Sequence, residues 1–102
     1  MTTTSQNQDS STEASLWTRC EDVVDTQVHD ETVLMSVRTG KYLFMNRTAS
    51  VIWELLNSPQ SMTQIIEVMT QRFAVDETRC QAEVSSLLTR LENAHMVARQ
   101  VG

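Results

Sequence analysis

The stretch "VRTGKYLFMNRTASVIWELL", from Val37 to Leu56, decides the fold. Gly40 can supply the positive φ that a tight hairpin turn needs, so we expect a turn here and a short apolar strand, Lys41–Met45, after it. Asn46 ends this strand and can cap a helix, because its side chain accepts hydrogen bonds from N–H groups of the first helical turn. Apolar residues at helical spacing follow. The stretch predicts a strand that leads directly into a helix, and nothing in it is typical of catalysis.

Two further strands are predicted upstream of this stretch. Val23–Val28 is the first, and the polar residues after it suit a turn. In the second, residues 32–37, alternation places Val33, Met35 and Val37 on one fully apolar face. Sequential strands with tight connections form an antiparallel meander. Such a meander leaves its third strand, Lys41–Met45, at the edge of the sheet.

Two helices are predicted downstream. Ser61 and Gln64 form a capping box, in which each side chain satisfies a backbone donor of the other residue. Asp76 can cap a third helix that we expect to end near Asn93, and residues 96–97 are expected to pack back on the core. A stripe of apolar residues runs along this third helix at positions 80, 84, 87, 88 and 91. The predicted fold class is α+β, with a three-stranded antiparallel sheet followed by three helices.

The chain is long enough for one domain of 102 residues. Residues 1–15 are almost entirely polar and are expected to form a disordered tail, so the folded domain is predicted to cover residues 16–102. The net charge is -5 at pH 7 and the pI is about 4.8. This balance argues against binding to nucleic acid or to an anionic membrane. Without an apolar run long enough for a membrane span, or a secretory leader, we expect a cytoplasmic location.

The sequence offers no convincing catalytic or metal-binding constellation. Its two cysteines, Cys20 and Cys80, lie far apart and are expected to be ordinary thiols, and two histidines are too few for a structural zinc site. Two glycines rule out a glycine-rich phosphate loop. Four carboxylates lie near the first predicted turn: Asp22, Asp25, Asp30 and Glu31. We expect them to belong to a solvated turn rather than to a metal site. We therefore expect no enzyme activity, no metal and no cofactor.

The edge strand "KYLFMN", Lys41–Asn46, is apolar on both faces. One face must lie on the helices. The other is covered either by the segment around Leu16 and Trp17 or by a partner, and the pattern leaves open whether the strand is buried or binds something. An open edge carries unpaired N–H and C=O groups, which favours the addition of an extended peptide as a fourth strand. The predicted helix Asp76–Asn93 would form the second wall of such a groove.

The order and spacing of these features resemble the PqqD family, named for pyrroloquinoline quinone synthesis protein D. The resemblance covers residues 23–97 and rests on an apolar strand, an R-x-G-x-Y turn, a strand that ends in Asn, the segments "IWELL" and "RFAVD", and a final L-L-x-x-L helix. It implies a winged helix-turn-helix that does not bind DNA. Such proteins bind the leader segment of a ribosomally made precursor peptide and present it to modifying enzymes.

In this family the leader lies as an added strand along the third strand, beside the third helix. Carried over to this chain, the resemblance implies a set of peptide-binding residues: Lys41, Tyr42, Leu43, Phe44, Met45 and Asn46 on the strand, and Glu83, Val84, Leu87, Leu88, Arg90 and Leu91 on the helix. Spacing alone leaves open which of the helix residues face the core. The implied partner enzymes are a separate leader protease and cyclase of a lasso-peptide pathway, or a radical S-adenosylmethionine enzyme. The alternatives are a winged-helix DNA-binding regulator and a homodimer paired through the free edge.

Overall fold

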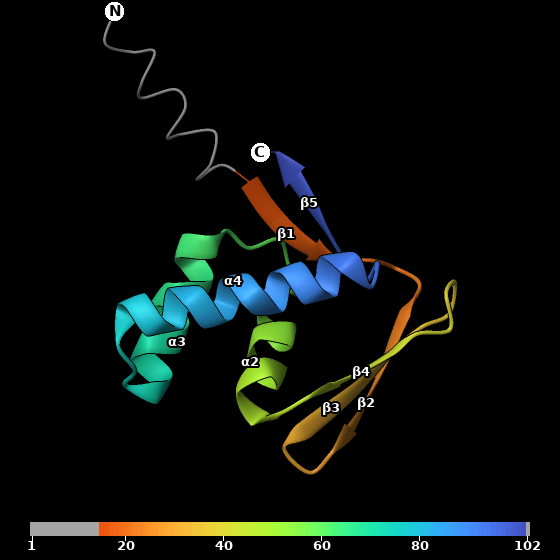
Figure 1. Ribbon diagram of the computed structural model, residues 1–102, viewed down its shortest axis with the longest axis horizontal. Coiled ribbons are helices and arrows are strands. Elements are labelled where there is room, and N and C mark those ends of the chain that lie inside the picture. Colours follow the sequence, from red (N-terminus) through yellow and green to blue (C-terminus); the bar gives the residue numbers. More distant parts are fainter. Residues whose placement is uncertain (1–14, 102) are drawn as a thin grey trace, which may run out of the picture.

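A computed structural model describes residues 15–101 of the chain. Figure 1 shows a small three-stranded sheet on one side of a group of three helices, with a separate two-stranded sheet that holds the two ends of the described chain. The elements, in chain order, are β1 (Ser15–Arg19), β2 (Val23–Val28), β3 (Glu31–Ser36), β4 (Tyr42–Met45), α2 (Arg47–Leu55), α3 (Met62–Phe73), α4 (Glu77–Asn93) and β5 (Val97–Val101). The predicted α+β class, with an antiparallel meander followed by three helices, is confirmed. The arrangement is compatible with a winged helix-turn-helix.

The three-stranded sheet has the order β2-β3-β4, so β4 is an edge strand as predicted. Gly40 has a φ of +75° in the turn before β4, which explains why glycine is used there. Three strand bounds differ from the prediction by a single residue: β3 begins at Glu31 and ends at Ser36, one residue early at each end, and β4 begins at Tyr42, one residue late.

The three helices begin where the capping residues predict. The Asn46 side chain accepts a hydrogen bond from the Ala49 amide at 2.9 Å. Ser61 and Gln64 form both bonds of the predicted capping box, and Asp76 caps α4. These side chains satisfy donors that the first turn of a helix leaves without a partner, so each helix start is fixed locally.

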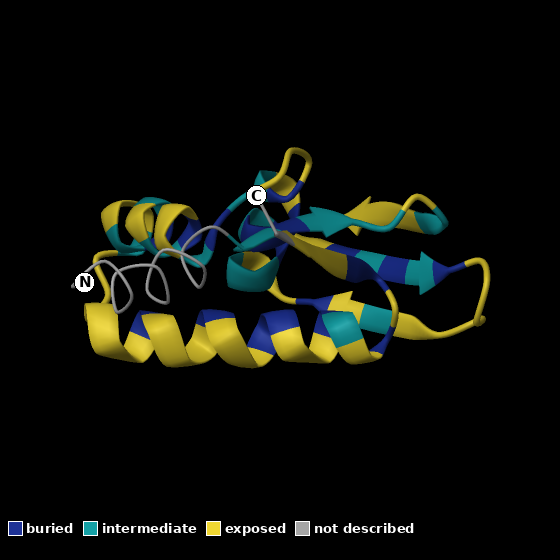
Figure 2. Cartoon of the chain, turned by 90° about the horizontal axis from the view of Figure 1, so that it is seen from above, coloured by how far each residue is buried: buried dark blue, intermediate teal, exposed yellow. Residues whose placement is uncertain are grey.

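The helix α4 supplies much of the core. Its buried residues face the other elements and its exposed residues face outward (Figure 2). The predicted stripe is confirmed, with Cys80, Val84, Leu87, Leu88 and Leu91 all buried. Met96 and Val97 are also buried, as expected. No helix within residues 15–101 is long and apolar enough to cross a membrane.

The sheet formed by β1 and β5 was not predicted from the sequence. The two strands pair antiparallel over their full length, from Ser15 with Val101 to Arg19 with Val97. Trp17 also exchanges two backbone hydrogen bonds with Gln60, which ties this sheet to the segment before α3. Ser15, which the prediction placed in the polar tail, is thus part of a strand. The rest of the predicted tail, residues 1–14, lies outside the described residues.

Because β1 pairs with β5, the segment around Leu16 and Trp17 does not cover the outer face of β4, which was one of the two expectations. The outward side chains Tyr42 and Phe44 are 60% and 74% exposed. The outer face of the edge strand is therefore open.

The inner face of β3 differs from the apolar face that alternation suggested. The buried residues are Thr32, Leu34 and Ser36, while Val37 is exposed. The Thr32 hydroxyl donates to the Ser50 hydroxyl at 2.9 Å, and Ser36 accepts a hydrogen bond from the Thr39 amide. Because these hydroxyl groups are paired, they can be buried at little cost.

Two of the four acidic residues near the first turn, Asp25 and Asp22, act in structural contacts. Asp25 accepts a hydrogen bond from the indole of Trp53 at 2.7 Å and pairs with Arg19. The Arg19 guanidinium lies 4.3 Å above the Trp53 ring and donates to the Trp53 carbonyl. Asp22 pairs with Arg38. The contacts among Arg19, Asp25 and Trp53 join β1, β2 and α2. No group of metal-ligating side chains is found among residues 15–101.

Candidate functional site

The backbone of β4 has one side paired and one side open. The Ser36 amide donates to the carbonyl of Lys41 at 2.9 Å, in continuation of the β3–β4 register. In an antiparallel ladder, every second residue directs its N–H and C=O groups to the same neighbour. Leu43 and Met45 therefore share the direction of Lys41 and point these groups toward β3.

The backbone groups of Tyr42 and Phe44 point the opposite way, to the open edge. No described strand pairs with β4 on this side. Two residues thus present two N–H and two C=O groups to any strand that is added here. This is the arrangement that β-augmentation requires.

The side chains of β4 alternate across the sheet. Met45 is buried at 1% exposed and Leu43 is half-buried, so both face the helices. Side chains directly opposite one another on paired strands share a face. Residues of an added strand opposite Leu43 and Met45 would therefore point toward the helices, and those opposite Tyr42 and Phe44 would point outward.

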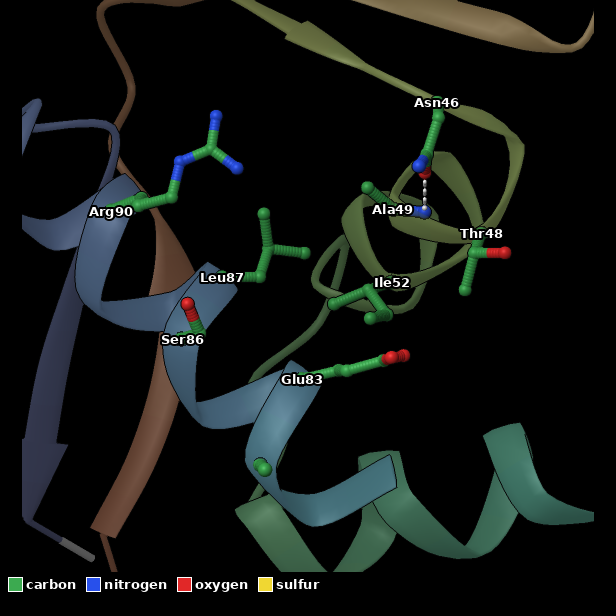
Figure 3. Close-up of a pocket in the computed structure, with 9 residues that line it drawn as sticks. Asn46, Thr48, Ala49, Ile52, Glu83, Ser86, Leu87 and Arg90 are labelled. Carbon is green, nitrogen blue, oxygen red and sulfur yellow. Dashed lines mark hydrogen bonds between the residues drawn. The ribbon is translucent and has the colours of Figure 1, made fainter. Parts of the chain in front are cut away.

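A groove between α2 and α4 begins where β4 ends at Asn46. Its volume is about 410 Å³. Figure 3 shows Ile52 and Leu87 facing one another across its floor, with Arg90 and Glu83 at opposite ends of the α4 wall. The remaining lining residues are Asn46, Thr48, Ala49, Ala82 and Ser86.

The floor of the groove is apolar and belongs to the core. Ile52 and Leu87 are 3% and 6% exposed, and both belong to the hydrophobic core. Asn46 is held by its bond to Ala49, so its side-chain amide N–H groups remain available at the rim of the groove. An apolar side chain of a bound peptide can pack on this floor while its backbone is paired to β4.

A smaller hollow of about 210 Å³ adjoins the groove and shares Thr48, Ile52 and Glu83 with it. Phe73 and Val75 help to line it, together with Cys80. Burial raises the pKa of the Cys80 thiol, which keeps this sulfur protonated and unsuited to act as a nucleophile. The hollow extends the apolar surface toward the start of α4.

The residues implied by the family resemblance separate into three groups in the structure. Asn46, Glu83, Leu87 and Arg90 line the groove together. The strand residues lie at the open edge or just before it. The other helix candidates, Val84, Leu88 and Leu91, are buried in the core with exposed fractions of 1% or less.

Sequence reasoning missed the wall that α2 contributes. Thr48, Ala49 and Ile52 of this helix line the groove, and Ile52 faces Leu87 of α4 across it (Figure 3). Their spacing after the Asn46 cap was visible in the sequence. What was missing was the knowledge that this side of α2 meets α4.

Comparisons with known proteins agree with the fold. The sequence model of the family described as "Coenzyme PQQ synthesis protein D (PqqD)" matches residues 31–97. The structure is similar to "TbiB1 in Complex with the TbiA(beta) Leader Peptide", with a TM-score of 0.73 and 25% identity over 78% of this chain and 93% of that one. It is also similar to "Lasso peptide synthetase B1 complexed with the leader peptide", with a TM-score of 0.71 and 23% identity over 80% of this chain and 96% of that one.

No curated protein matches the chain. The family match nevertheless covers about two thirds of the sequence, from β3 through α4 to the start of β5. It includes the open edge strand, the helix that follows it and both walls of the groove. This chain therefore belongs to the PqqD family.

Proposed function

We propose that this protein is a non-catalytic adaptor that binds the leader segment of a ribosomally synthesised precursor peptide. The leader pairs with the open edge of β4 as a fourth strand. Its inward side chains pack into the groove between α2 and α4. The adaptor thereby raises the effective concentration of the attached precursor near a separate modifying enzyme.

One observation carries this proposal. The open backbone groups of Tyr42 and Phe44 lie directly before a groove with an apolar floor, formed by Ile52 and Leu87. Backbone pairing contributes to binding of an extended chain of any sequence, and pockets for alternate side chains add affinity and specificity. An edge without a groove would favour simple self-pairing instead.

The two similar structures support a peptide leader as the ligand, because each is described as a complex with a leader peptide. They also favour a lasso-peptide pathway over one that uses a radical S-adenosylmethionine enzyme, since one of them is a lasso peptide synthetase B1. The partner of this chain would then be a separate leader protease and cyclase.

The charges on α4 favour this function over DNA binding. The helix carries three acidic and two basic side chains: Glu77, Glu83, Glu92, Arg79 and Arg90. A helix that reads the major groove of DNA normally presents Arg and Lys toward phosphates and bases. The mixed charge of α4, on a chain of net charge -5, gives no such surface.

A fluorescence-anisotropy titration tests the proposal. The probe is the labelled leader of the precursor peptide encoded nearest to the gene for this protein, with a scrambled leader as the control. We expect saturable binding between micromolar and nanomolar, lost on scrambling. Absence of binding by the folded protein, or sequence-specific binding of duplex DNA at physiological salt, would overturn it. Sizing of the protein with and without peptide shows whether the edge pairs with a second copy instead.

A further inference from the structure

The basic side chains of the described residues differ in whether they form ion pairs. Four basic side chains of the described chain form ion pairs with carboxylates, namely Arg19, Arg38, Arg79 and Arg99. Arg90 lines the groove, and its guanidinium has no hydrogen bond or ion pair with any residue from 15 to 101. It is therefore free to accept a ligand.

The sequence around Arg90 explains why it is unpaired. Side chains three and four residues apart meet on a helix surface. For Arg90 these neighbours are Ser86, Leu87, Asn93 and Ala94, and none carries a carboxylate. By contrast, Arg79 on the same helix pairs with Glu83 four residues later, at 3.2 Å.

The other end of the α4 wall carries Glu83, whose carboxylate is already paired with Arg79 at 3.2 Å. Glu83 lines both the groove and the adjoining hollow. It lies seven residues before Arg90, about 10 Å along the helix axis. Leu87 lies between the two charges and forms the apolar floor with Ile52 (Figure 3).

We propose that Arg90 selects the peptide by binding a carboxylate of the leader. This inference rests on the proposed function. The planar guanidinium suits paired hydrogen bonds to a carboxylate, and the neighbouring apolar floor removes part of the water around it. The preferred ligand is a strand with an acidic side chain at the Arg90 end and an apolar one over Ile52 and Leu87.

Strand geometry fixes the spacing of this pattern. Residues two apart on a strand point to the same side and are separated by about 6.8 Å. Leu87 is three residues from Arg90, which is about 4.5 Å along the helix. The carboxylate and the apolar anchor of the peptide should therefore be two residues apart, with both side chains on the face that points toward the helices.

Selection from a displayed library of random peptides, with the full chain as bait, tests the proposal. We expect peptides enriched by the wild-type protein to carry Asp or Glu two positions from an apolar residue. Replacing that acid by its amide should weaken binding about tenfold. The Arg90→Glu variant should select Lys or Arg at this position and should restore binding to the charge-reversed peptide.

Arg72→Glu is the matched control. Arg72 is also exposed and has no ion pair among the described residues, but it lies on α3, outside the groove. This variant changes the net charge equally and should leave the acidic preference intact. If enriched peptides show no acidic preference, or if the two variants behave alike, the charge selection is wrong while the adaptor function stands. If the folded protein enriches no peptide and binds no leader, the adaptor function itself is wrong.

Discussion

The Phe44→Pro variant separates backbone pairing from side-chain contact at the edge of β4. Proline has no N–H group, so this change removes one donor from the open edge. It removes no hydrogen bond to β3, because the N–H of Phe44 points away from that strand. Proline is tolerated on edge strands for this reason. The peptide should lose one hydrogen bond, which contributes about 1 kcal/mol and corresponds to about a fivefold weaker affinity.

Two control variants make this comparison sharp. Phe44→Ala removes the same side chain but keeps the N–H, and because Phe44 is exposed, the change should alter affinity little. Leu43→Pro removes a donor that faces β3, so it should lower the free energy of unfolding by more than about 1 kcal/mol. Anisotropy titrations with the leader peptide measure affinity, and thermal unfolding followed by circular dichroism checks the fold.

Equal affinities of the Phe44→Pro and Phe44→Ala variants would refute this reasoning. The peptide would then bind without using the edge, through side chains in the groove alone. A collapse of the fold in Phe44→Pro, as large as that in Leu43→Pro, would show that the direction of the backbone groups has been assigned wrongly. The first result would place the peptide away from the edge of β4, and the second would make Leu43 and Met45 the residues whose backbone groups face that edge.

Three further outcomes concern stability. Ala74 has a φ of +51° after α3, so Ala74→Gly should relieve strain and raise the free energy of unfolding by about 1 kcal/mol in urea titrations; no gain would mean that glycine flexibility cancels the relief. Asp25→Ala leaves the Trp53 indole N–H without its acceptor and should cost about 1 kcal/mol; unchanged urea unfolding would show that water replaces the carboxylate. Burial raises the pKa of the Cys80 thiol, so stability should be unaffected below about pH 8.5 and should fall above it, as the unfolded thiol ionises first. Burial also raises the pKa of Cys20, so Cys80→Ala should reduce this alkaline decline without abolishing it, and an unchanged pH profile would assign the decline to Cys20 and other groups.

Local signals explain why the helices could be predicted. A capping side chain and the helix that it starts are adjacent in sequence, as with Asn46 and Ser61, so the information is contained in a few residues. The turn at Gly40 is equally local. The stripe on α4 was also predictable, since a helix with one buried side repeats its apolar residues regularly.

The sheet of β1 and β5 depends on contacts between residues about 80 positions apart. Each strand has only five residues, and neither shows a strict alternation. Only the pairing makes either segment a strand. A pattern read along the chain carries no information about such a partner.

The buried face of β3 could not be assigned from the sequence for a different reason. Alternation showed two faces, and the more apolar one was the natural candidate for the core. The structure buries Thr32 and Ser36 instead, because Ser50 and the Thr39 amide provide their hydrogen bonds. These partners come from α2 and from the turn before β4, and their positions follow only from the tertiary fold.

The short length of β4 limits what backbone pairing can contribute. Only Tyr42 and Phe44 direct backbone groups outward, so an added strand gains at most four hydrogen bonds, each worth about 1 kcal/mol. Ordering a flexible peptide costs about 1–2 kcal/mol for each backbone residue that is fixed. Pairing alone therefore leaves little net affinity. Burial of one apolar side chain contributes about 1.5–3 kcal/mol, so the floor formed by Ile52 and Leu87 must supply the difference. Affinity and selectivity then both depend on the groove, while the edge of β4 sets the register in which the peptide meets it.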